Sequence, residues 1–381
     1  MKIVMVHPHD LWSPKEPWTI RIRALAKELK HRGHDITLVT FTLDGFETEP
    51  LFQDEILTHC FSRRISMRSY FAKIKKLKKI FQDADLIHFQ KCFHFSACPV
   101  VLAAWICGKH LHYDWDDDET AIYHSGKKTP SFWIGLGIRF LEWALPRVAD
   151  SVSVSSEILK NKALKRGVPE FRLTKVWVGA DSVSVSESDV KTIQARYGLD
   201  SQSQIYIGQL HGAQYVELLL KACLTLQESG IIQKTVIVGD GHDRSRLEAL
   251  SKKWGLSSCV HFVGAVPHEK IPTWLSACRI AVACFENNEA TRSKSPLKIA
   301  EYLRSEKAIV AHAVGEVPLM LENAGFLVDP TDPDGLGHAL LHLHRNPALI
   351  EDLENKAKYR AKYLRWTDSA EKLQTLFQKV M

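Results

Sequence analysis

Residues 285–319 carry the side chains whose types and spacing best suit the binding of a phosphorylated ligand. A polar loop there reaches Pro296, which suits the first position of a helix because proline has no N–H to satisfy. A helix start offers free N–H groups and a positive dipole end to phosphate, and Lys294 and Lys298 add positive charge beside it. Glu301, one turn further on, can accept hydrogen bonds from the paired hydroxyls of a sugar. These residues predict a nucleotide-sugar site, although an ordinary capped helix with solvated lysines has the same pattern.

A second group of reactive side chains lies in the sequence HLHYDWDDDE at 110–119. Because neighbouring acids repel one another, burial of some of them would raise a pKa and provide a proton carrier. The candidate catalytic residues of this run are His112, Asp114, Asp116 and Asp117. Two alternatives stay open. The run could be a solvated acidic turn, or Asp114 and Asp116 could bind Mg²⁺ or Mn²⁺ on a diphosphate. We expect no metal cofactor, because the helix start and lysines above already provide for a diphosphate.

Composition indicates a globular protein with an anionic partner. The 381 residues suffice for about two domains, and 45% hydrophobic with 25% charged residues is typical of a packed core. The net charge of +6 favours a partner such as a nucleotide phosphate or a lipid surface. We expect no nucleic acid as a partner, because the sequence has neither a zinc-finger pattern nor a basic arm.

Cysteine usage and the apolar runs predict a cytoplasmic location. The eight cysteines are scattered without a CxxC pair, which favours reduced core residues. No signal peptide is recognisable at the start. The most apolar run, 95–107, is too short to span a bilayer and contains Pro99.

Strands and helices alternate along the whole chain, which predicts an α/β protein with parallel sheets covered on both faces. We expect strands at 2–6, 35–40, 85–89, 109–113, 151–154, 173–178, 204–207, 234–238, 260–262, 280–283, 308–311 and 325–328. A Ser-rich linker at 179–189 separates a first domain, 1–180, from a second, 187–366. Asp368 and Glu371 form a capping box for a C-terminal helix, 367–381, which we expect to return to the first domain. The loop 7–19 follows the first strand, so it lies at a candidate ligand-binding edge.

The segment 69–81 predicts a basic amphipathic helix. Phe71, Ile74, Leu77 and Phe81 would share one face, with lysines around the rest. Such a helix could lie on an anionic membrane, which would make the protein peripheral to its inner face, or pack on the sheet. The apolar helix predicted at 131–145 is either core or partly lipid-facing.

Several short motifs in the second half occur in an order typical of one enzyme family. They are VIVGDG at 236–241, VHFVGAV at 260–266, SPLKIAEY at 295–302, VGEVP at 314–318 and GFLVDP at 325–330. Weaker matches in the first half are KIV at 2–4, GH at 33–34 and VSVSSE at 152–157, with GAD at 179–181 between the halves. This set resembles the retaining glycosyltransferases of family 4. The resemblance implies the GT-B fold, in which two Rossmann-like, doubly wound parallel-sheet domains face each other across a cleft.

The resemblance also implies roles for individual donor-binding residues. Glu301 matches the glutamate that binds the ribose, and Ser295 and Leu297 match the backbone of the diphosphate turn. Gly239 and Gly241 match glycines beside the nucleotide, and Val266 matches a position at the base. The sequence departs from the family at Ser293, where a glutamate is usual, and at Gln209, where an arginine is usual. Missing charge could come from Lys294, Lys298 or Arg292.

The resemblance implies a metal-independent, retaining hexosyltransferase of polysaccharide biosynthesis. The donor would be a UDP- or GDP-sugar and the acceptor a glycan, a lipid-linked intermediate or a small molecule. An alternative is a catalytically impaired nucleotide-sugar-binding protein with the same fold. A weaker one is an epimerase or a phosphorylase, and the latter would need a pyridoxal phosphate lysine that no sequence context marks.

Overall fold

The structure is a computed structural model that describes residues 1–12, 19–42, 51–125, 131–211 and 216–381. The chain divides into two compact units. Unit 1 comprises Met1–Val178, Ser293–Ser295 and Trp366–Met381, and unit 2 comprises Gly179–Arg292 and Pro296–Arg365. Residues 13–18 of the candidate loop at 7–19 lie outside the described residues, as does Tyr215, the first residue of a helix that the sequence predicts over 215–227.

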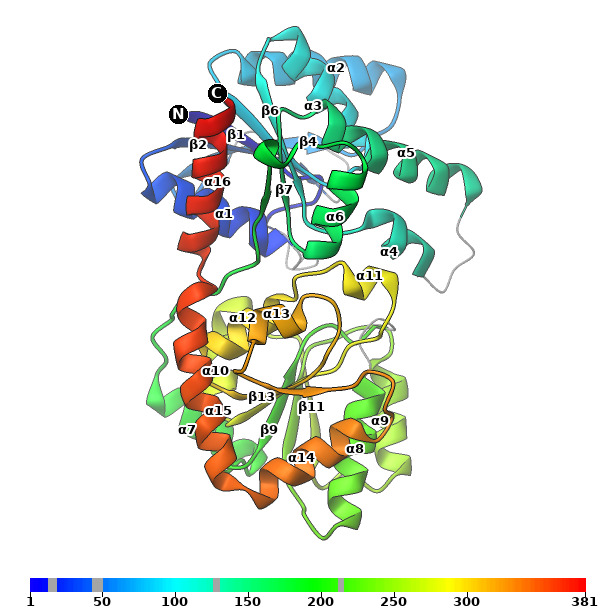
Figure 1. The fold of residues 1–381 in the computed structure, drawn as a ribbon, viewed down its shortest axis with the longest axis vertical. Coiled ribbons are helices and arrows are strands. Elements are labelled where there is room, and N and C mark those ends of the chain that lie inside the picture. The colour runs from blue at the N-terminus through cyan, green and yellow to red at the C-terminus, as the bar shows by residue number, and fades with distance from the viewer. Residues whose placement is uncertain (13–18, 43–50, 126–130, 212–215) are drawn as a thin grey trace. The chain divides into compact units, whose positions relative to one another are not determined.

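Unit 1 is built on an eight-stranded sheet with the order β3-β4-β2-β1-β5-β6-β7-β8 (Figure 1). The strands are β1 Lys2–Val6, β2 Asp35–Thr42, β3 Leu51–Gln53, β4 Ile56–Ser62, β5 Leu86–Gln90, β6 His110–Trp115, β7 Ser151–Val154 and β8 Leu173–Lys175. All neighbours are parallel except β3, which is antiparallel to β4. The strand order reverses between β1 and β5, and such switch points are where open parallel sheets bind ligands.

Helices cover both faces of this sheet. They are α1 Ile20–His31, α2 Met67–Phe81, α3 His94–Ile106, α4 Glu119–Ser125, α5 Phe132–Val148, α6 Glu157–Lys165 and α16 Trp366–Val380. Side chains of α2, α3, α5 and α6 join one core with one face of the sheet. On the other face α16 lies beside α1 (Figure 1), and the Phe377 ring meets the ring of His112 at 4.9 Å.

Unit 2 contains a six-stranded parallel sheet with the order β11-β10-β9-β12-β13-β14. The strands are β9 Gln204–Ile207, β10 Thr235–Val238, β11 Val260–Gly264, β12 Ile280–Ala283, β13 Ala308–His312 and β14 Phe326–Val328. The helices are α7 Glu187–Tyr197, α8 Val216–Glu228, α9 Arg244–Lys253, α10 Ile271–Ser276, α11 Glu289–Arg292, α12 Leu297–Arg304, α13 Val317–Leu321, α14 Gly335–Arg345 and α15 Pro347–Arg360. Both units are therefore doubly wound α/β units, which confirms the predicted fold class.

Local differences from the sequence predictions have simple causes. The hairpin β3–β4 adds two strands that the alternation rule did not predict, since that rule covers only strands joined through helices. Helix α12 begins after Pro296 and not at it. The capping box was wrong, because α16 begins at Trp366 and places Asp368 inside its first turn.

Helix α2 settles the choice left open for the basic segment. Ile74, Leu77 and Phe81 are buried in the core of unit 1, so the helix packs on the sheet. The prediction that Phe71 shares this face is wrong, because Phe71 is 65% exposed. Lys73 is buried in its place and donates to the Arg64 carbonyl at 2.9 Å.

Cysteine burial agrees with the sequence expectation. All eight cysteines lie in the described part of the chain, where none forms a disulfide bond and six are buried. Across the part of the chain that the structure describes, we find no helix with the length and apolar character needed to cross a membrane.

Candidate functional site

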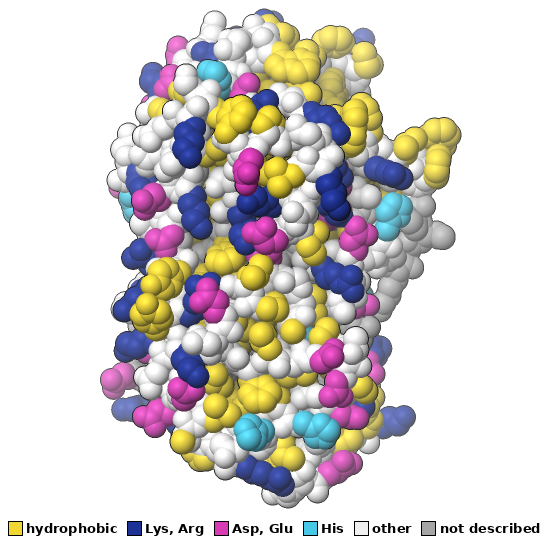
Figure 2. Space-filling view, in the orientation of Figure 1, with side chains coloured by type: hydrophobic (Ala, Val, Ile, Leu, Met, Phe, Trp, Pro, Cys, Tyr) yellow, Lys and Arg dark blue, Asp and Glu magenta, His cyan; other side chains and the backbone are white. Residues whose placement is uncertain are grey.

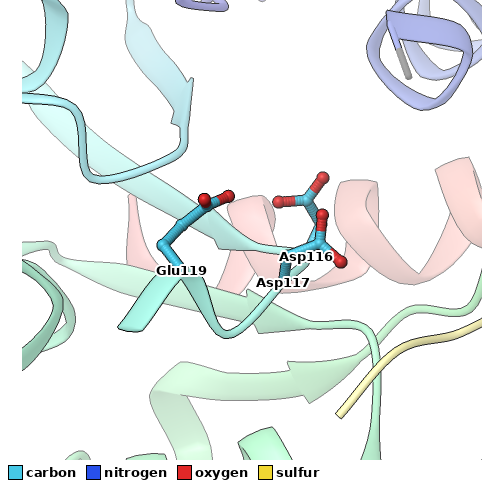
Figure 3. Close-up of side chains that lie close together, drawn as sticks. All are labelled: Asp116, Asp117 and Glu119. Carbon is cyan, nitrogen blue, oxygen red and sulfur yellow. The ribbon is translucent and has the colours of Figure 1, made fainter. Parts of the chain in front are cut away.

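The carboxyl end of β5 in unit 1 places Lys91 among three acids. Its Nζ lies 3.0 Å from Asp116 and 2.9 Å from Glu119, and it also bonds Asp117. Asp116 and Asp117 follow β6, while Glu119 starts α4. Carboxylate oxygens of these three acids lie within 4.8 Å of one another (Figure 3). Lys91 has a φ of 66°, an uncommon conformation for a residue with a side chain. Its buried side chain thus sits at the switch point of the sheet.

Among the residues that the structure describes, these three acids form a group whose ligand atoms lie close enough together to hold a metal ion. Hard cations such as Mg²⁺ prefer carboxylate oxygens, so the donor set is chemically suitable. In the structure, however, the Lys91 ammonium contacts all three carboxylates. A metal ion would have to displace this ammonium to reach them.

Burial sets unequal proton affinities within this group. Burial raises the pKa of Asp116 to about 7, and the nearby Asp117 adds to the rise while Lys91 opposes it. Although burial acts the same way on Asp117, Lys91 holds the pKa of that carboxyl below its usual range. The three acids outweigh burial at Lys91 and raise its pKa well above the ordinary value. Asp116 is therefore a group that can gain or lose a proton near neutral pH.

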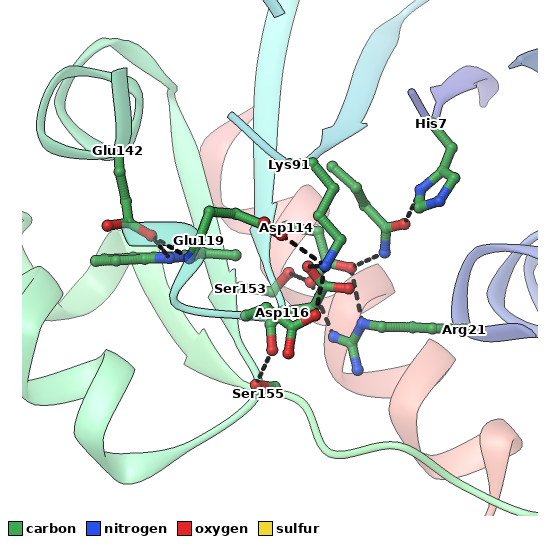
Figure 4. A network of polar contacts seen from close by, with 12 residues as sticks. His7, Arg21, Lys91, Asp114, Asp116, Glu119, Glu142, Ser153 and Ser155 are labelled. Atoms are coloured by element: carbon green, nitrogen blue, oxygen red, sulfur yellow. Dashed lines mark hydrogen bonds and ion pairs between the residues drawn. The ribbon is translucent and has the colours of Figure 1, made fainter. Parts of the chain in front are cut away.

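Asp114 and His112 lie within β6, just before this edge, and both are buried. Both oxygens of Asp114 accept hydrogen bonds from Arg21 of α1, at 2.9 and 2.8 Å, and Ser153 and Gln90 donate to it as well (Figure 4). Arg21 holds the pKa of Asp114 below its usual range although burial opposes this. With its oxygens engaged, Asp114 is not available as half of an Asp-x-Asp metal site.

His112 is completely buried, with its ring nitrogens 2.8 and 2.9 Å from the hydroxyls of Ser151 and Ser153. Burial holds its pKa well below the ordinary value, so the ring is neutral. The predicted catalytic group thus divides in two: Asp116 and Asp117 lie at the edge, while His112 and Asp114 tie β6 to β7 and α1. The solvated-turn alternative is wrong for the run, since Asp118 and Glu119 are also buried.

Glu142 of α5 is bonded to residues beside the acidic edge. It accepts hydrogen bonds from the Glu119 backbone N–H at 2.8 Å, the Thr120 hydroxyl at 2.6 Å and the Trp115 indole at 3.3 Å (Figure 4). Burial raises its pKa to about 7. These bonds fix the first turn of α4 and with it the position of Glu119.

In unit 2 the predicted donor residues gather at the carboxyl edge of the sheet. Gln209, Gly239, Gly241 and Val266 follow β9, β10 and β11, and parallel strands end at the same edge. A Cβ atom on Gly239 would lie 1.9 Å from the carbonyl oxygen of Gly208, and one on Gly241 would lie 2.4 Å from that of Leu210. Glycine is therefore required at both positions, because the loop backbones approach each other closely.

Lys298 reaches the same edge from the first turn of α12. It is buried, and its Nζ donates to the Tyr206 hydroxyl at 3.1 Å and lies 4.2 Å from the centre of that ring. A Cβ atom on Gly208 would lie 2.7 Å from this Nζ, so the glycine makes room for it. Burial lowers the pKa of Lys298 to about 7, which means that a nearby anion would favour its charged form.

Glu301 is one turn further along α12 and remains partly accessible. Its side chain is 12% exposed, and its Oε1 lies 2.7 Å from Nε2 of His268, which is half exposed. Our sequence reasoning did not identify His268. The available signal was its position four residues after the end of β11, at the edge where the other donor residues gather.

The remaining predicted donor residues are placed less uniformly. Ser293 is fully buried, and Ser295 accepts a hydrogen bond from the Val178 N–H at 3.3 Å. Arg292 is exposed and donates to the Asn287 side chain at 2.6 Å. Lys294 is partly buried, and Leu297 begins α12. Our sequence reasoning also missed Arg21, Lys91 and Tyr206, whose partners are distant in the sequence.

Comparison with known proteins defines the class of protein to which this fold and these edges belong. The fold is that of the GT-B enzymes. Sucrose-phosphate synthase from Thermosynechococcus elongatus superposes with a TM-score of 0.79 at 18% identity, over 100% of this chain and 99% of that one. Anabaena HepE in complex with UDP superposes with a TM-score of 0.76 at 16% identity, over 99% of this chain and 100% of that one.

Sequence comparison then gives the family. The family model for glycosyl transferases group 1 matches residues 202–346, and that for glycosyltransferase family 4 matches residues 19–182. The chain belongs to the family 4 glycosyltransferases. It is 26% identical over 223 residues to alpha-D-kanosaminyltransferase of Streptomyces kanamyceticus, which covers 57% of this chain and 56% of that one. It is 27% identical over 184 residues to D-inositol 3-phosphate glycosyltransferase of Corynebacterium jeikeium (strain K411), which covers 46% and 43%. The chain thus spans about half the length of the curated relatives it matches.

Proposed function

We propose that the protein is a glycosyltransferase that moves a sugar from a UDP- or GDP-sugar to a glycan, lipid-linked or small-molecule acceptor. One observation carries the proposal: α12 presents Lys298 and Glu301, one turn apart, at the carboxyl edge of the unit 2 sheet. Family membership and the UDP-bound HepE neighbour support the same donor chemistry.

The ribose and the diphosphate of the nucleotide-sugar donor would each have binding residues at this edge. Glu301 would exchange its contact with His268 for the ribose hydroxyls. The first N–H groups of α12 and the Lys298 ammonium would bind the diphosphate. Gly239 and Gly241 leave the loop backbones without side chains, so a nucleotide could approach closely.

The reaction we propose is a metal-independent transfer with retention. The bond between the anomeric carbon and the diphosphate oxygen breaks, and the acceptor oxygen bonds to that carbon on the same face of the sugar. The acceptor proton passes to the leaving diphosphate. Lys298 and the helix N–H groups would stabilise the developing negative charge, and Asp116 and Asp117 would bind hydroxyls of the sugar or acceptor.

Calorimetric titration with UDP and GDP tests the site. We expect Glu301→Ala to weaken the preferred nucleotide by about 10- to 100-fold, because hydrogen bonds to a charged group contribute about 1.5–3 kcal/mol. Glu248→Ala is the matched control, since Glu248 pairs with Arg244 on the surface of α9. Equal affinity of Glu301→Ala and the wild-type chain would show that the site is assigned wrongly.

Turnover separates an enzyme from a protein that only binds the donor. The binding alternative is favoured by Ser293, which is buried where the family has a glutamate. Incubation with a panel of UDP- and GDP-sugars should release nucleotide, and this release should persist in EDTA. Nucleotide binding without hydrolysis or transfer of any donor would favour the alternative.

A further inference from the structure

Two neighbouring helices of unit 1, α3 and α5, turn an apolar side outward. α3 packs against both α2 and α5, and the inward side chains of all three join one core. The exposed large hydrophobic residues of α3 and α5, which we call the α3–α5 apolar face, are Leu102, Trp105, Ile106, Phe132, Trp133, Ile134, Leu136, Phe140 and Trp143. Figure 2 shows hydrophobic side chains gathered over the region where Figure 1 draws α5. Contiguous patches of this kind mark contact with a partner or a membrane.

Helix α5 exposes large aromatic side chains and buries its one acid. Its acid, Glu142, is buried and bonded to α4, whereas Trp133 is 77% exposed. Phe140 and Trp143 stack on the outside, with ring centres 6.1 Å apart. The outward face of a helix that faces only water is mainly polar and charged, whereas that of α5 is mainly apolar. The outward face of α5 is therefore suited to an apolar surrounding.

Basic side chains border this apolar face. Lys75, Lys78, Lys79 and Lys109 line a hollow of about 390 Å³ together with Gln82, Cys107 and Ile106. We call it the lysine hollow, and Ile106 belongs both to it and to the α3–α5 apolar face. Neither α2 nor α3 contains an acidic residue.

Helix α5 contributes cations of its own next to its aromatic rings. Arg139 and Arg147 are exposed, and the Arg147 guanidinium lies 4.2 Å from the centre of the Trp143 ring. The apolar face is therefore bordered by positive charge on α2 and on α5.

This combination matches one kind of partner. Aromatic side chains with apolar bodies favour the headgroup level of a bilayer, and lysines beside them attract anionic lipids. We propose that this side of unit 1 binds an anionic lipid bilayer, with the α3–α5 apolar face inserted and the lysine hollow against lipid phosphates. The apolar stripe of α2 takes no part, because it is buried. The proposal does not depend on the nucleotide site of unit 2.

Co-sedimentation of the full chain with vesicles tests the proposal. We expect binding to vesicles of phosphatidylcholine mixed with phosphatidylglycerol, and little binding to phosphatidylcholine alone. Added salt should weaken binding, because it screens exposed charges. The double variant Trp133→Ser/Phe140→Ser should bind at least about tenfold more weakly, since it removes two inserted rings. The variant Lys75→Glu/Lys79→Glu should lose a similar factor together with most of the salt dependence.

Two controls change the same residue types elsewhere. Phe171→Ser removes a ring that is 70% exposed but lies outside the α3–α5 apolar face. Lys252→Glu/Lys253→Glu reverses two exposed lysines of α9 in unit 2. Both should bind vesicles as the wild-type chain does, and thermal unfolding should show that all variants are folded.

Three results would overturn the proposal. The first is equal vesicle binding by Trp133→Ser/Phe140→Ser and the wild-type chain, and the second is equal binding to both vesicle compositions. The third is that inorganic phosphate, at the same concentration as the lipid phosphate, competes for the protein as well as the vesicles do. A dimer that Trp133→Ser/Phe140→Ser converts to a monomer, without vesicle binding by either form, would instead assign the face to a second copy of the chain.

Discussion

Two buried lysines, one at the carboxyl edge of each sheet, have pKa values that are shifted in opposite directions. Lys91 in unit 1 touches three carboxylates, which raise its pKa well above the ordinary value although burial opposes the rise. Lys298 in unit 2 touches the hydroxyl and ring of Tyr206, and burial lowers its pKa to about 7. Position in the fold and depth of burial are similar, so neighbouring charge makes the difference.

The comparison teaches how each edge is completed. Around Lys91 the chain supplies both signs of charge itself, and the cluster is fixed before any ligand arrives. Around Lys298 burial lowers the pKa to about 7, so the side chain is only partly charged near neutral pH, and a diphosphate would favour its ammonium form. Unit 1 therefore provides an acidic edge whose carboxylates already contact a cation, whereas the edge of unit 2 would gain its full charge only with its proposed substrate.

The largest effect should come from Lys91→Met. It leaves three acids together without their cation, and removing one partner of a buried ion pair costs about 3–5 kcal/mol. Urea unfolding measures the loss, and hydrogen exchange of β5 and β6 assigns it to unit 1. The control is Lys160→Met, whose surface pair with Glu170 at 3.5 Å should contribute about 0–1 kcal/mol. A loss as small as that of the control would mean that the cluster does not depend on Lys91.

The matching change in unit 2, Lys298→Met, should act on binding and not on folding. Methionine has a similar volume and no charge to desolvate, so we expect the free energy of unfolding to change by less than about 1.5 kcal/mol. Affinity for UDP or GDP should fall about tenfold or more, because a charge-assisted contact with phosphate is lost. Destabilisation equal to that of Lys91→Met, with unchanged affinity, would remove the contrast between the two lysines.

A third effect, spread over about three pH units, should appear in the pH dependence of stability. The folded pKa of Asp116 is about 7, above the value of 3.8 for an exposed aspartate. Between these values the folded chain holds a proton that the unfolded chain has lost, so the contribution of Asp116 to stability decreases as pH rises through this window. The slope is at most about 1.4 kcal/mol per pH unit. Asp116→Asn should flatten it, while Asp83→Asn, on an exposed acid, should not. An unchanged slope in Asp116→Asn would exclude the raised pKa.

The smallest effect should be proton uptake on nucleotide binding. At about pH 8 Lys298 is mostly neutral in the free chain, since its pKa is about 7. A bound diphosphate raises that pKa, so the complex takes up part of a proton. Calorimetry in buffers of different ionisation enthalpy measures the uptake. Lys298→Met should abolish it, and uptake that persists in this variant would have to come from another group.

The sequence was sufficient to predict where the strands end, but not which charged side chains pair with one another near these ends. Alternating strands and helices located the ends of β9, β10 and β11, and the family resemblance placed Gly239, Gly241 and Val266 beside the nucleotide. In the structure these three residues follow β10 and β11 at the carboxyl edge of the sheet. The partner of Asp114 is Arg21, 93 residues away, and no local pattern connects them. Lys91 likewise lies in the short connection between β5 and α3, where hydrophobic periodicity gives no signal.

The acidic run shows why burial was harder to predict than position. Strand β6 is buried on both faces, so the sequence HLHYDW has no alternation to distinguish its two sides. His112 and Asp114 point to the same side, two residues apart, and meet α16 and α1 there. The run of acids therefore includes Asp114, which is buried and bonded to Arg21, as well as the more accessible Asp116 and Asp117 at the edge of the sheet.

Helix α16 makes unit 1 discontinuous in the chain, since it begins only at Trp366. On a ribosome that adds about 5–20 residues per second, roughly 10 to 40 seconds pass between emergence of Val178 and of this helix. During that interval the side of the sheet that contains His112 has no Phe377 to cover it. All of unit 2 is synthesised before α16, so unit 1 is the first unit to be started and the last to be completed. The nascent unit 1 is therefore exposed to aggregation or proteolysis for longer.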